Sequence, residues 1–237
     1  MFDFGGTLFH FYDEEKNCRL YYKIFRKYGY NTSLEKIRKV RKNEYRKQMK
    51  ENYGDPNRHG KSHMLIKRVL EKLNFDVDDR TFNKIVEEYE VERSKYFKAY
   101  PGVHETLSKL RKQKIKLIIV SNGNRKWLNK QMRRININSF FSLIITSQEL
   151  GYEKSSLVPF TMALKKLKLK PEECLMIGDR VDEDMHAKKI GIWTCHAGYG
   201  PKLPIVGKKV NPDFKINEIR ELLNVIDKIN SARSNSS

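Results

Sequence analysis

Four groups of residues in this 237-residue chain combine side chains that bind metal ions or phosphate groups. They are Asp3 within Phe2–Thr7, Ser121–Gly123, the single Lys154, and Asp179 with Asp184. A carboxylate at the end of a buried strand costs free energy unless a cation or a reacting group offsets the cost. Carboxylates brought together also repel one another. The residue types therefore indicate a cation site, and Asp3 and Asp179 are hard oxygen ligands of the kind that Mg²⁺ prefers.

Three of these groups follow short apolar runs that we expect to be strands. From Pro101 onward such runs alternate with helical patterns, which is typical of a parallel α/β sheet. The expected strands cover 115–120, 143–146, 174–177, 192–195 and 213–216, and the expected helices cover 103–113, 126–134, 156–167, 184–190 and a final helix to about 229. Ligands of open α/β sheets lie beyond the carboxyl ends of the strands, so one crevice could gather all four groups.

Residues 9–98 carry no such motif and predict four helices. The expected helices cover 13–28, 32–50, 61–73 and 79–97. Apolar residues at i, i+3 and i+4 spacing mark the first of these helices. Thr32-Ser33-Leu34-Glu35 has the pattern of a capping box that opens the second.

In order and spacing, the four groups resemble the motifs of the haloacid dehalogenase-like hydrolase superfamily. Those motifs are Asp-x-Asp-x-Thr, then Ser or Thr, then Lys, then Gly-Asp-x4-Asp. The resemblance covers nearly the whole chain. Within the superfamily, the chain is similar to the subgroup that has a helical cap between the first two motifs, which includes phosphoglycolate phosphatase-like members. It implies an α/β fold, with a Rossmann-like parallel sheet core and an inserted four-helix cap. The expected domains are a core of 1–12 and 99–230, a cap of 13–98, and a flexible tail of 231–237.

The resemblance also implies a phosphatase reaction. Asp3 would attack phosphorus and form an aspartyl-phosphate, while Lys154 and Ser121 would stabilise the transferring phosphoryl group. Mg²⁺ would be held by Asp3, Asp179, Asp184 and the backbone carbonyl of Gly5. The expected substrate-binding residues are Gly6, Thr7, Ser121, Asn122, Gly123 and Lys154.

The first motif departs from the family pattern at Gly5, where most phosphatases of this family carry a second aspartate as general acid and base. Such catalysis typically contributes about 10²–10⁴-fold in rate. His10 could replace that acid, although a linker histidine is the simpler interpretation. Ser155 also stands where a proline usually follows the motif lysine. Only Met1 and Phe2 precede Asp3, so either the first strand is short or the natural chain begins upstream.

Two alternatives stay open. The dehalogenase branch also lacks the second aspartate and needs no metal, but the intact Gly178-Asp179-x4-Asp184 argues against it. A degenerate, catalytically weak member could instead serve as a basic nucleic-acid- or protein-binding module. The net charge of +19, from 48 Lys and Arg against 29 Asp and Glu, would suit that role. Lysine-rich composition explains the charge equally, so we expect a small phosphorylated substrate and do not favour nucleic acid.

Composition also bounds where the protein acts. No apolar run approaches the roughly 18 residues that a membrane span needs, and no secretory leader precedes Asp3. Cys18, Cys174 and Cys195 are widely spaced and odd in number, so we expect buried thiols in a reducing compartment. The expected location is cytoplasmic. The sequence leaves open whether the protein is a monomer or a homodimer.

Overall fold

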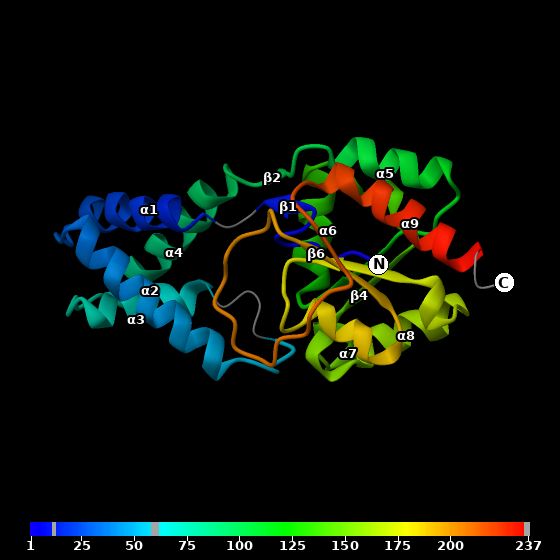
Figure 1. Ribbon diagram of the computed structural model, residues 1–237. Helices are drawn as coiled ribbons and strands as arrows, with labels where there is room; N and C mark the ends of the chain where they lie inside the picture. The colour runs from blue at the N-terminus through cyan, green and yellow to red at the C-terminus, as the bar shows by residue number, and fades with distance from the viewer. Residues whose placement is uncertain (11–12, 58–61, 235–237) are drawn as a thin grey trace. The chain divides into compact units, whose positions relative to one another are not determined.

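The computed structural model describes residues 1–10, 13–57 and 62–234, which form two compact units. An α/β unit contains residues 1–10, 54–57 and those from 98 onward, and a helical unit contains the others. Figure 1 shows the elements of both units. The division lies close to the expected boundaries at 12/13 and 98/99. It differs at 54–57, which we expected in the cap and which belong to the α/β unit.

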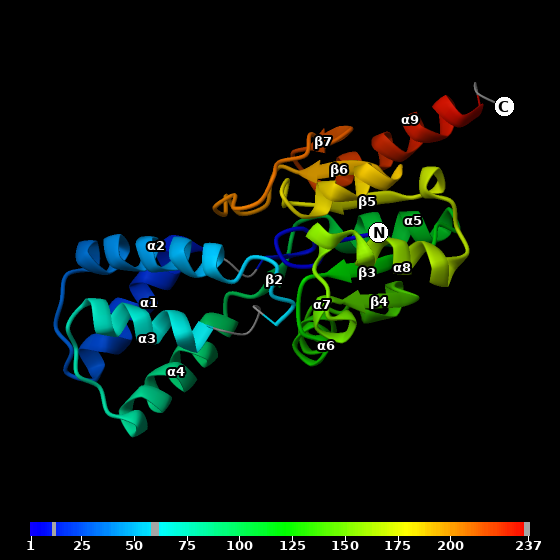
Figure 2. The same cartoon turned by 90° about the horizontal axis from the view of Figure 1, so that it is seen from below.

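Six parallel segments form the sheet of the α/β unit. They are Met1–Asp3, β3 (Ile118–Ser121), β4 (Leu143–Thr146), β5 (Leu175–Gly178), β6 (Trp193–Ala197) and β7 (Phe214–Ile216). Their order is β4, β3, Met1–Asp3, β5, β6, β7, which can be followed in Figure 2. The parallel α/β fold expected from the sequence is confirmed.

The segment Met1–Asp3 is short but lies at the centre of this sheet. The Phe2 N–H donates to the Ile118 carbonyl and the Val120 N–H donates to the Phe2 carbonyl, both at 2.9 Å. On the other side, the Asp3 N–H donates to the Ile177 carbonyl at 2.8 Å. These bonds hold Asp3 at the carboxyl end of a central strand, where ligands of such sheets bind.

Helices cover both faces of the sheet: α5 (Val103–Lys112) and α9 (Leu222–Ser234) lie on one face and α8 (Val158–Leu167) on the other (Figure 1). The remaining helices of this unit are α6 (Arg125–Arg134), α7 (Ser147–Leu150), and the 3₁₀ segments η1 (Asn138–Phe140), η2 (Lys154–Ser156), η3 (Pro171–Glu173), η4 (Asp184–Ile190) and η5 (Ile219–Glu221). Buried residues such as Ile118, Phe160 and Met176 fill the space between the sheet and α8.

The helix expected over 184–190 is present and has 3₁₀ geometry. One expectation for this unit needs correction. Helix α9 continues to Ser234, so residues 231–234 are helical and not part of a flexible tail, while 235–237 lie outside the described residues.

The helical unit consists of α1 (Glu14–Lys27), α2 (Leu34–Glu51), α3 (Ser62–Lys72) and α4 (Asp79–Ser94). Its core includes Tyr21, Phe25, Ile66 and Tyr89. The cap of α2 is Ser33, whose hydroxyl accepts from the Lys36 N–H, and not Thr32 as the capping-box pattern predicted. No helix in the described part of the chain is both long and apolar enough to cross a bilayer.

The chain leaves and re-enters the α/β unit through a small ribbon. Strand β1 (Phe9–His10) pairs antiparallel with β2 (Lys98–Ala99). Two-residue strands have no periodicity, so the sequence could not predict them. Two hydrogen bonds hold the segment Gly54–Asn57 within the α/β unit. The Gly54 N–H donates to Glu153 and the Ser147 hydroxyl donates to the Pro56 carbonyl, each at 2.9 Å.

Candidate active site

Three carboxylates from separate parts of the α/β unit converge at the carboxyl end of the sheet. Asp3 ends the central strand, Asp179 directly follows β5, and Asp184 begins η4. One oxygen of each lies within 4.8 Å of the others. Both oxygens of Asp179 are shielded from solvent and accept no hydrogen bond from the described residues. A buried carboxylate without donors is costly, which indicates that something else binds there.

Glycines leave the space that these carboxylates occupy. A Cβ at Gly178 would lie 2.1 Å from Asp184 Oδ2, and one at Gly6 would lie 2.6 Å from Asp179 Oδ2. Gly6 also has a φ of +89°, which a side chain would strain. Gly6 was expected to bind substrate, and here its lack of a side chain makes room for Asp179.

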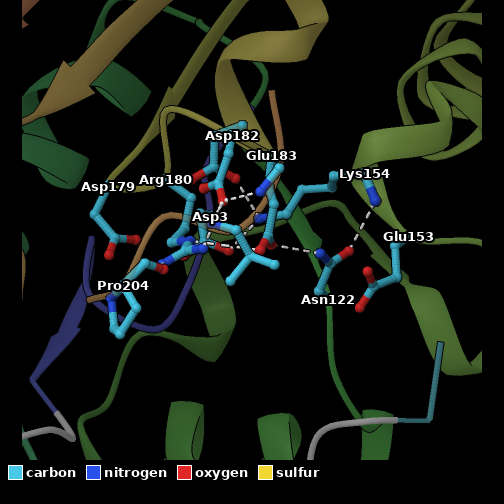
Figure 3. A network of polar contacts seen from close by, with 12 residues as sticks. Asp3, Asn122, Glu153, Lys154, Asp179, Arg180, Asp182, Glu183 and Pro204 are labelled. Carbon is cyan, nitrogen blue, oxygen red and sulfur yellow. Dashed lines mark hydrogen bonds and ion pairs between the residues drawn. The ribbon is translucent and has the colours of Figure 1, made fainter. Parts of the chain in front are cut away.

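Lys154 is the cation at the centre of this cluster. Its Nζ donates to Asp3 Oδ1 at 2.6 Å and also to Asp184 Oδ1, and the side chain is almost completely buried (Figure 3). Burial alone would lower the pKa of Lys154, but the charges of Asp184 and Asp3 outweigh burial and raise that pKa. Lys154 therefore stays protonated and shields the two carboxylates from each other.

One lysine does not balance three carboxylates. Burial raises the pKa of Asp3, although Lys154 opposes that rise. Burial and the charges of Asp3 and Asp184 raise the pKa of Asp179 well above its usual range. Burial also raises the pKa of Asp184 to about 7, against the opposing charge of Lys154. A hard divalent cation would remove this penalty, and oxygen donors are the ligands it prefers, so the residues fit such a cation.

Asn122 connects three of the four motifs. Its carboxamide oxygen accepts the Lys154 backbone N–H at 2.9 Å, and its amide nitrogen donates to Glu183 Oε2 at 2.7 Å (Figure 3). Asn122 was expected to bind substrate, but these bonds occupy its side chain. Ser121 lies beside it at the end of β3, and its hydroxyl makes no hydrogen bond with the part of the chain that the structure describes. Gly123 follows, and a Cβ placed on it would lie 3.6 Å from the Ser121 hydroxyl oxygen.

Thr7 lies on the other side of the site, within the turn after Asp3. Its carbonyl accepts from the Tyr199 hydroxyl at 2.9 Å, and its own hydroxyl is buried without a partner among the described residues. The Tyr199 ring contacts Tyr100 edge-on, and Tyr100 in turn contacts His10 in the same way, with centroids 5.0 and 5.4 Å apart. His10 is thus part of an aromatic row beside the turn.

Sequence reasoning missed a second polar network next to Asp179. Asp182 is fully buried and accepts from Arg180 at 2.9 Å and from the backbone N–H groups of Val206 and Gly207 at 2.8 and 3.0 Å. Arg180 also donates to the Pro204 carbonyl at 2.9 Å. The only available signal was the run of charges in Asp179–Asp184, which contains more acids than a metal site needs.

Comparison with known proteins agrees with this geometry. The model of the haloacid dehalogenase-like hydrolase family matches residues 1–197. A glyceraldehyde 3-phosphate phosphatase of Methanopyrus kandleri is 32% identical over 67% of this chain and 69% of its own length. Pyrophosphatase PpaX of Oceanobacillus iheyensis is 27% identical over 67% of this chain and 74% of its own.

A solved structure shares the fold. The HAD-type hydrolase YfnB of Bacillus subtilis, in a magnesium-bound form, superposes with a TM-score of 0.71 at 18% identity, covering 95% of this chain and 96% of that one. The match of the family model to residues 1–197 includes all four motifs at the site. The chain is therefore a hydrolase that belongs to the haloacid dehalogenase-like family.

Proposed function

We propose that this HAD-family phosphatase is a Mg²⁺-dependent phosphomonoester hydrolase that acts on a small phosphorylated metabolite. The reaction would pass through an aspartyl-phosphate formed on Asp3. The observation that carries the proposal is the convergence of Asp3, Asp179 and Asp184 around Lys154, with both Asp179 oxygens lacking a hydrogen bond to the described residues.

Asp3, Asp179 and Asp184 would hold the cation, together with the Gly5 carbonyl. When bound, Mg²⁺ supplies positive charge that favours the ionised carboxylates and the anionic phosphoryl group. The magnesium-bound YfnB structure supports this assignment by fold. The assignment also explains why Asp179 adjoins Asp3 and Asp184 although Lys154 pairs only with those two.

The remaining residues position and stabilise the phosphoryl group. Lys154 holds Asp3 and favours its ionised form, so the carboxylate would attack phosphorus while the ester oxygen leaves. Lys154 would neutralise charge on the phosphoryl oxygens, and the Ser121 hydroxyl is available to donate to one of them. Asn122 sets the position of Lys154 through its backbone, so its role is positioning instead of binding.

With glycine at position 5, the chain lacks the aspartate that usually donates a proton to the leaving group. Alkyl leaving groups need that proton most, whereas aryl and other acidic leaving groups depart without it. We therefore expect activity to rise as the pKa of the leaving alcohol falls.

The relatives suggest where to look for the substrate. The proteins similar to this chain are named for glyceraldehyde 3-phosphate and for pyrophosphate. These two compounds, other triose phosphates and phosphoglycolate come first in a substrate panel, with an aryl phosphate as the easily cleaved reference.

Phosphate release from this panel, with Mg²⁺ or with EDTA, tests the proposal. Wild type should release phosphate only with Mg²⁺, Asp3→Asn should be inactive, and Asp227→Asn, at an exposed aspartate, should match wild type. A 2-haloacid in the same panel tests the dehalogenase alternative. Metal-independent dehalogenation, or no turnover of any phosphate by folded protein, would overturn the proposal.

A further inference from the structure

Helix α2 carries a row of cations along its solvent face. Lys36, Lys39, Lys42, Arg46 and Lys50 are all exposed and follow one another at intervals of three or four residues. Residues at this spacing lie on one side of a helix. Ile37, Arg41 and Glu44 are the buried residues of α2, which packs against α1 and α3. We call the five exposed cations the α2 basic stripe.

The stripe has no ion-pair partners among the described residues. None of its five charged groups forms an ion pair or a side-chain hydrogen bond there. Other cations of the helical unit do find acidic partners. These pairs include Lys16–Asp13, Arg19–Glu15, Lys27–Glu88, Arg38–Glu15, Arg68–Glu51 and Lys95–Glu92. Exposed cations without an ion pair to the described residues also occur on the other helices, for example Lys23, Lys67 and Lys84, but on α2 five of them follow one another in one row.

Such a row has an electrostatic cost in the free protein. Like charges at i, i+3 and i+4 positions destabilise a helix by a few tenths of a kcal/mol per pair. A polyanion bound along the stripe would remove that repulsion.

The stripe is long and straight. From Lys36 to Lys50 it spans 14 residues, or about 21 Å at about 1.5 Å per residue. One strand of a nucleic-acid duplex carries a phosphate about every 3.4 Å along its axis, so about six phosphates lie within this length, and those on the near side of the winding strand can contact the stripe. A single small phosphate ester could engage only one or two of these cations.

An adjoining groove extends the positive surface. It has a volume of about 400 Å³ and is lined by Val40, Asn43, Glu44, Arg46, Lys47 and Lys72. Lys72 comes from α3 and is also exposed, so the cationic surface reaches across two helices. None of the large exposed apolar side chains found among the described residues lies on α2. Without aromatic side chains on which bases could stack, binding would use phosphates alone.

We propose that the α2 basic stripe binds the phosphate backbone of duplex nucleic acid without regard to sequence. The total charge of the chain does not single out this partner, but the arrangement of these unpaired cations on one helix does. Because the stripe belongs to the helical unit and the catalytic residues to the α/β unit, binding does not depend on the proposed phosphatase reaction.

Fluorescence anisotropy with labelled duplexes of about 20 base pairs, DNA and RNA in separate arms, tests the proposal from about 50 to 200 mM salt. The stripe variant changes all five cations to Gln. A matched variant changes five exposed lysines of the α/β unit to Gln, namely Lys112, Lys116, Lys126, Lys130 and Lys165. Both variants lower the net charge equally, and circular dichroism checks that they fold.

We expect the stripe variant to bind at least about tenfold more weakly and to lose about four from the slope of log K against log salt. The matched variant should keep its slope within about one. If the fivefold variant does not fold, Lys42→Gln with Arg46→Gln should lose about two from the slope. Equal losses in both variants, no binding of either duplex by wild type, or stripe-dependent binding to phosphatidylserine vesicles but not to a duplex would each overturn the proposal.

Discussion

The carboxamide oxygen of Asn122 accepts the backbone N–H of Lys154 at 2.9 Å, which ties the end of β3 to the lysine of the candidate active site. The same amide group donates to Glu183, so it spans the space between the second and fourth motifs. Lys154 is thus oriented through its backbone, while its charge is directed at Asp3 and Asp184. The position of Lys154 depends on its backbone bond to Asn122, whereas its charge acts on Asp3 and Asp184. Substitutions can therefore change one without changing the other.

Asn122→Ala should reduce kcat by about 5- to 150-fold, because losing a buried hydrogen bond costs about 1–3 kcal/mol. Asn124→Ala is the matched control, since Asn124 lies two residues after Asn122 and caps α6 by accepting the Trp127 N–H. Asn124→Ala should lower the unfolding midpoint by about as much as Asn122→Ala does, but it should leave kcat unchanged. Steady-state kinetics and thermal unfolding of both variants make the comparison, and equal kcat values would rule out the positioning role.

Asp179→Asn should stabilise the protein in EDTA and abolish its stabilisation by Mg²⁺. The substitution removes a buried carboxylate that lacks donors among the described residues and adjoins Asp3 and Asp184. We expect a gain of at least about 1 kcal/mol, or roughly 2–4 °C in the unfolding midpoint. Scanning fluorimetry with and without Mg²⁺ measures both effects. A destabilised variant in EDTA would show that Asp179 already has a favourable environment without metal.

The metal-free protein should become more stable as pH falls from about 7 to 5.5. The pKa of Asp184 is about 7 in the folded protein, compared with about 3.9 in an unfolded chain. Between these values the folded state binds a proton that the unfolded state has released. Stability therefore rises by up to about 1.4 kcal/mol for each unit of pH decrease in this window, and is lost as pH rises toward 7.

The control for this prediction is Asp184→Asn, measured in EDTA over the same range. His196, whose pKa is lowered by burial, acts in the opposite direction and contributes equally to both proteins. The slope of stability against pH should differ between them by the Asp184 contribution. Identical slopes would contradict a raised pKa at Asp184.

Asp182→Asn should loosen the segment from Pro201 to Val210. The two backbone N–H groups of this segment and the Arg180 guanidinium all donate to one oxygen, Asp182 Oδ2, and Asn replaces this charged acceptor with a weaker, neutral one. Trypsin should cleave at Lys202, Lys208 or Lys209 faster in the variant than in wild type. Asp179→Asn, three residues earlier, should leave the cleavage rate unchanged. Equal rates in wild type and Asp182→Asn would show that other contacts hold the segment.

Gly5→Asp should raise activity toward alkyl phosphates more than toward aryl phosphates. A carboxylic acid at this position could protonate a poor leaving group, a step typically worth about 10²–10⁴-fold. Gly5 is not among the residues with positive φ, so its backbone accepts an aspartate. Comparing kcat/KM for one alkyl and one aryl phosphate, with Gly5→Asn as control, measures the effect. A uniform change for both substrates would point to altered binding instead.

The sequence predicted the sheet and the four motifs because each strand is a compact apolar run and each motif lies at its end. It could not predict that Asn122 and Glu183 bond to each other, since they are 61 positions apart and neither carries a periodic signal. For the same reason the sequence could not predict that the Val206 and Gly207 N–H groups donate to Asp182. The cap of α2 shifted by one residue because Thr32 and Ser33 are both good caps, and the chain entering the helix decides between them.

Direct detection of a phosphoryl group on Asp3 tests the central claim. The enzyme would be mixed with ³²P-labelled substrate, quenched in acid and digested, and the labelled peptide identified. With Mg²⁺, wild type should carry the label on Asp3 and lose it in hydroxylamine, which cleaves acyl phosphates, while Asp3→Asn and wild type in EDTA should carry none. Label on another residue, or phosphate release by Asp3→Asn at the wild-type rate, would contradict the account.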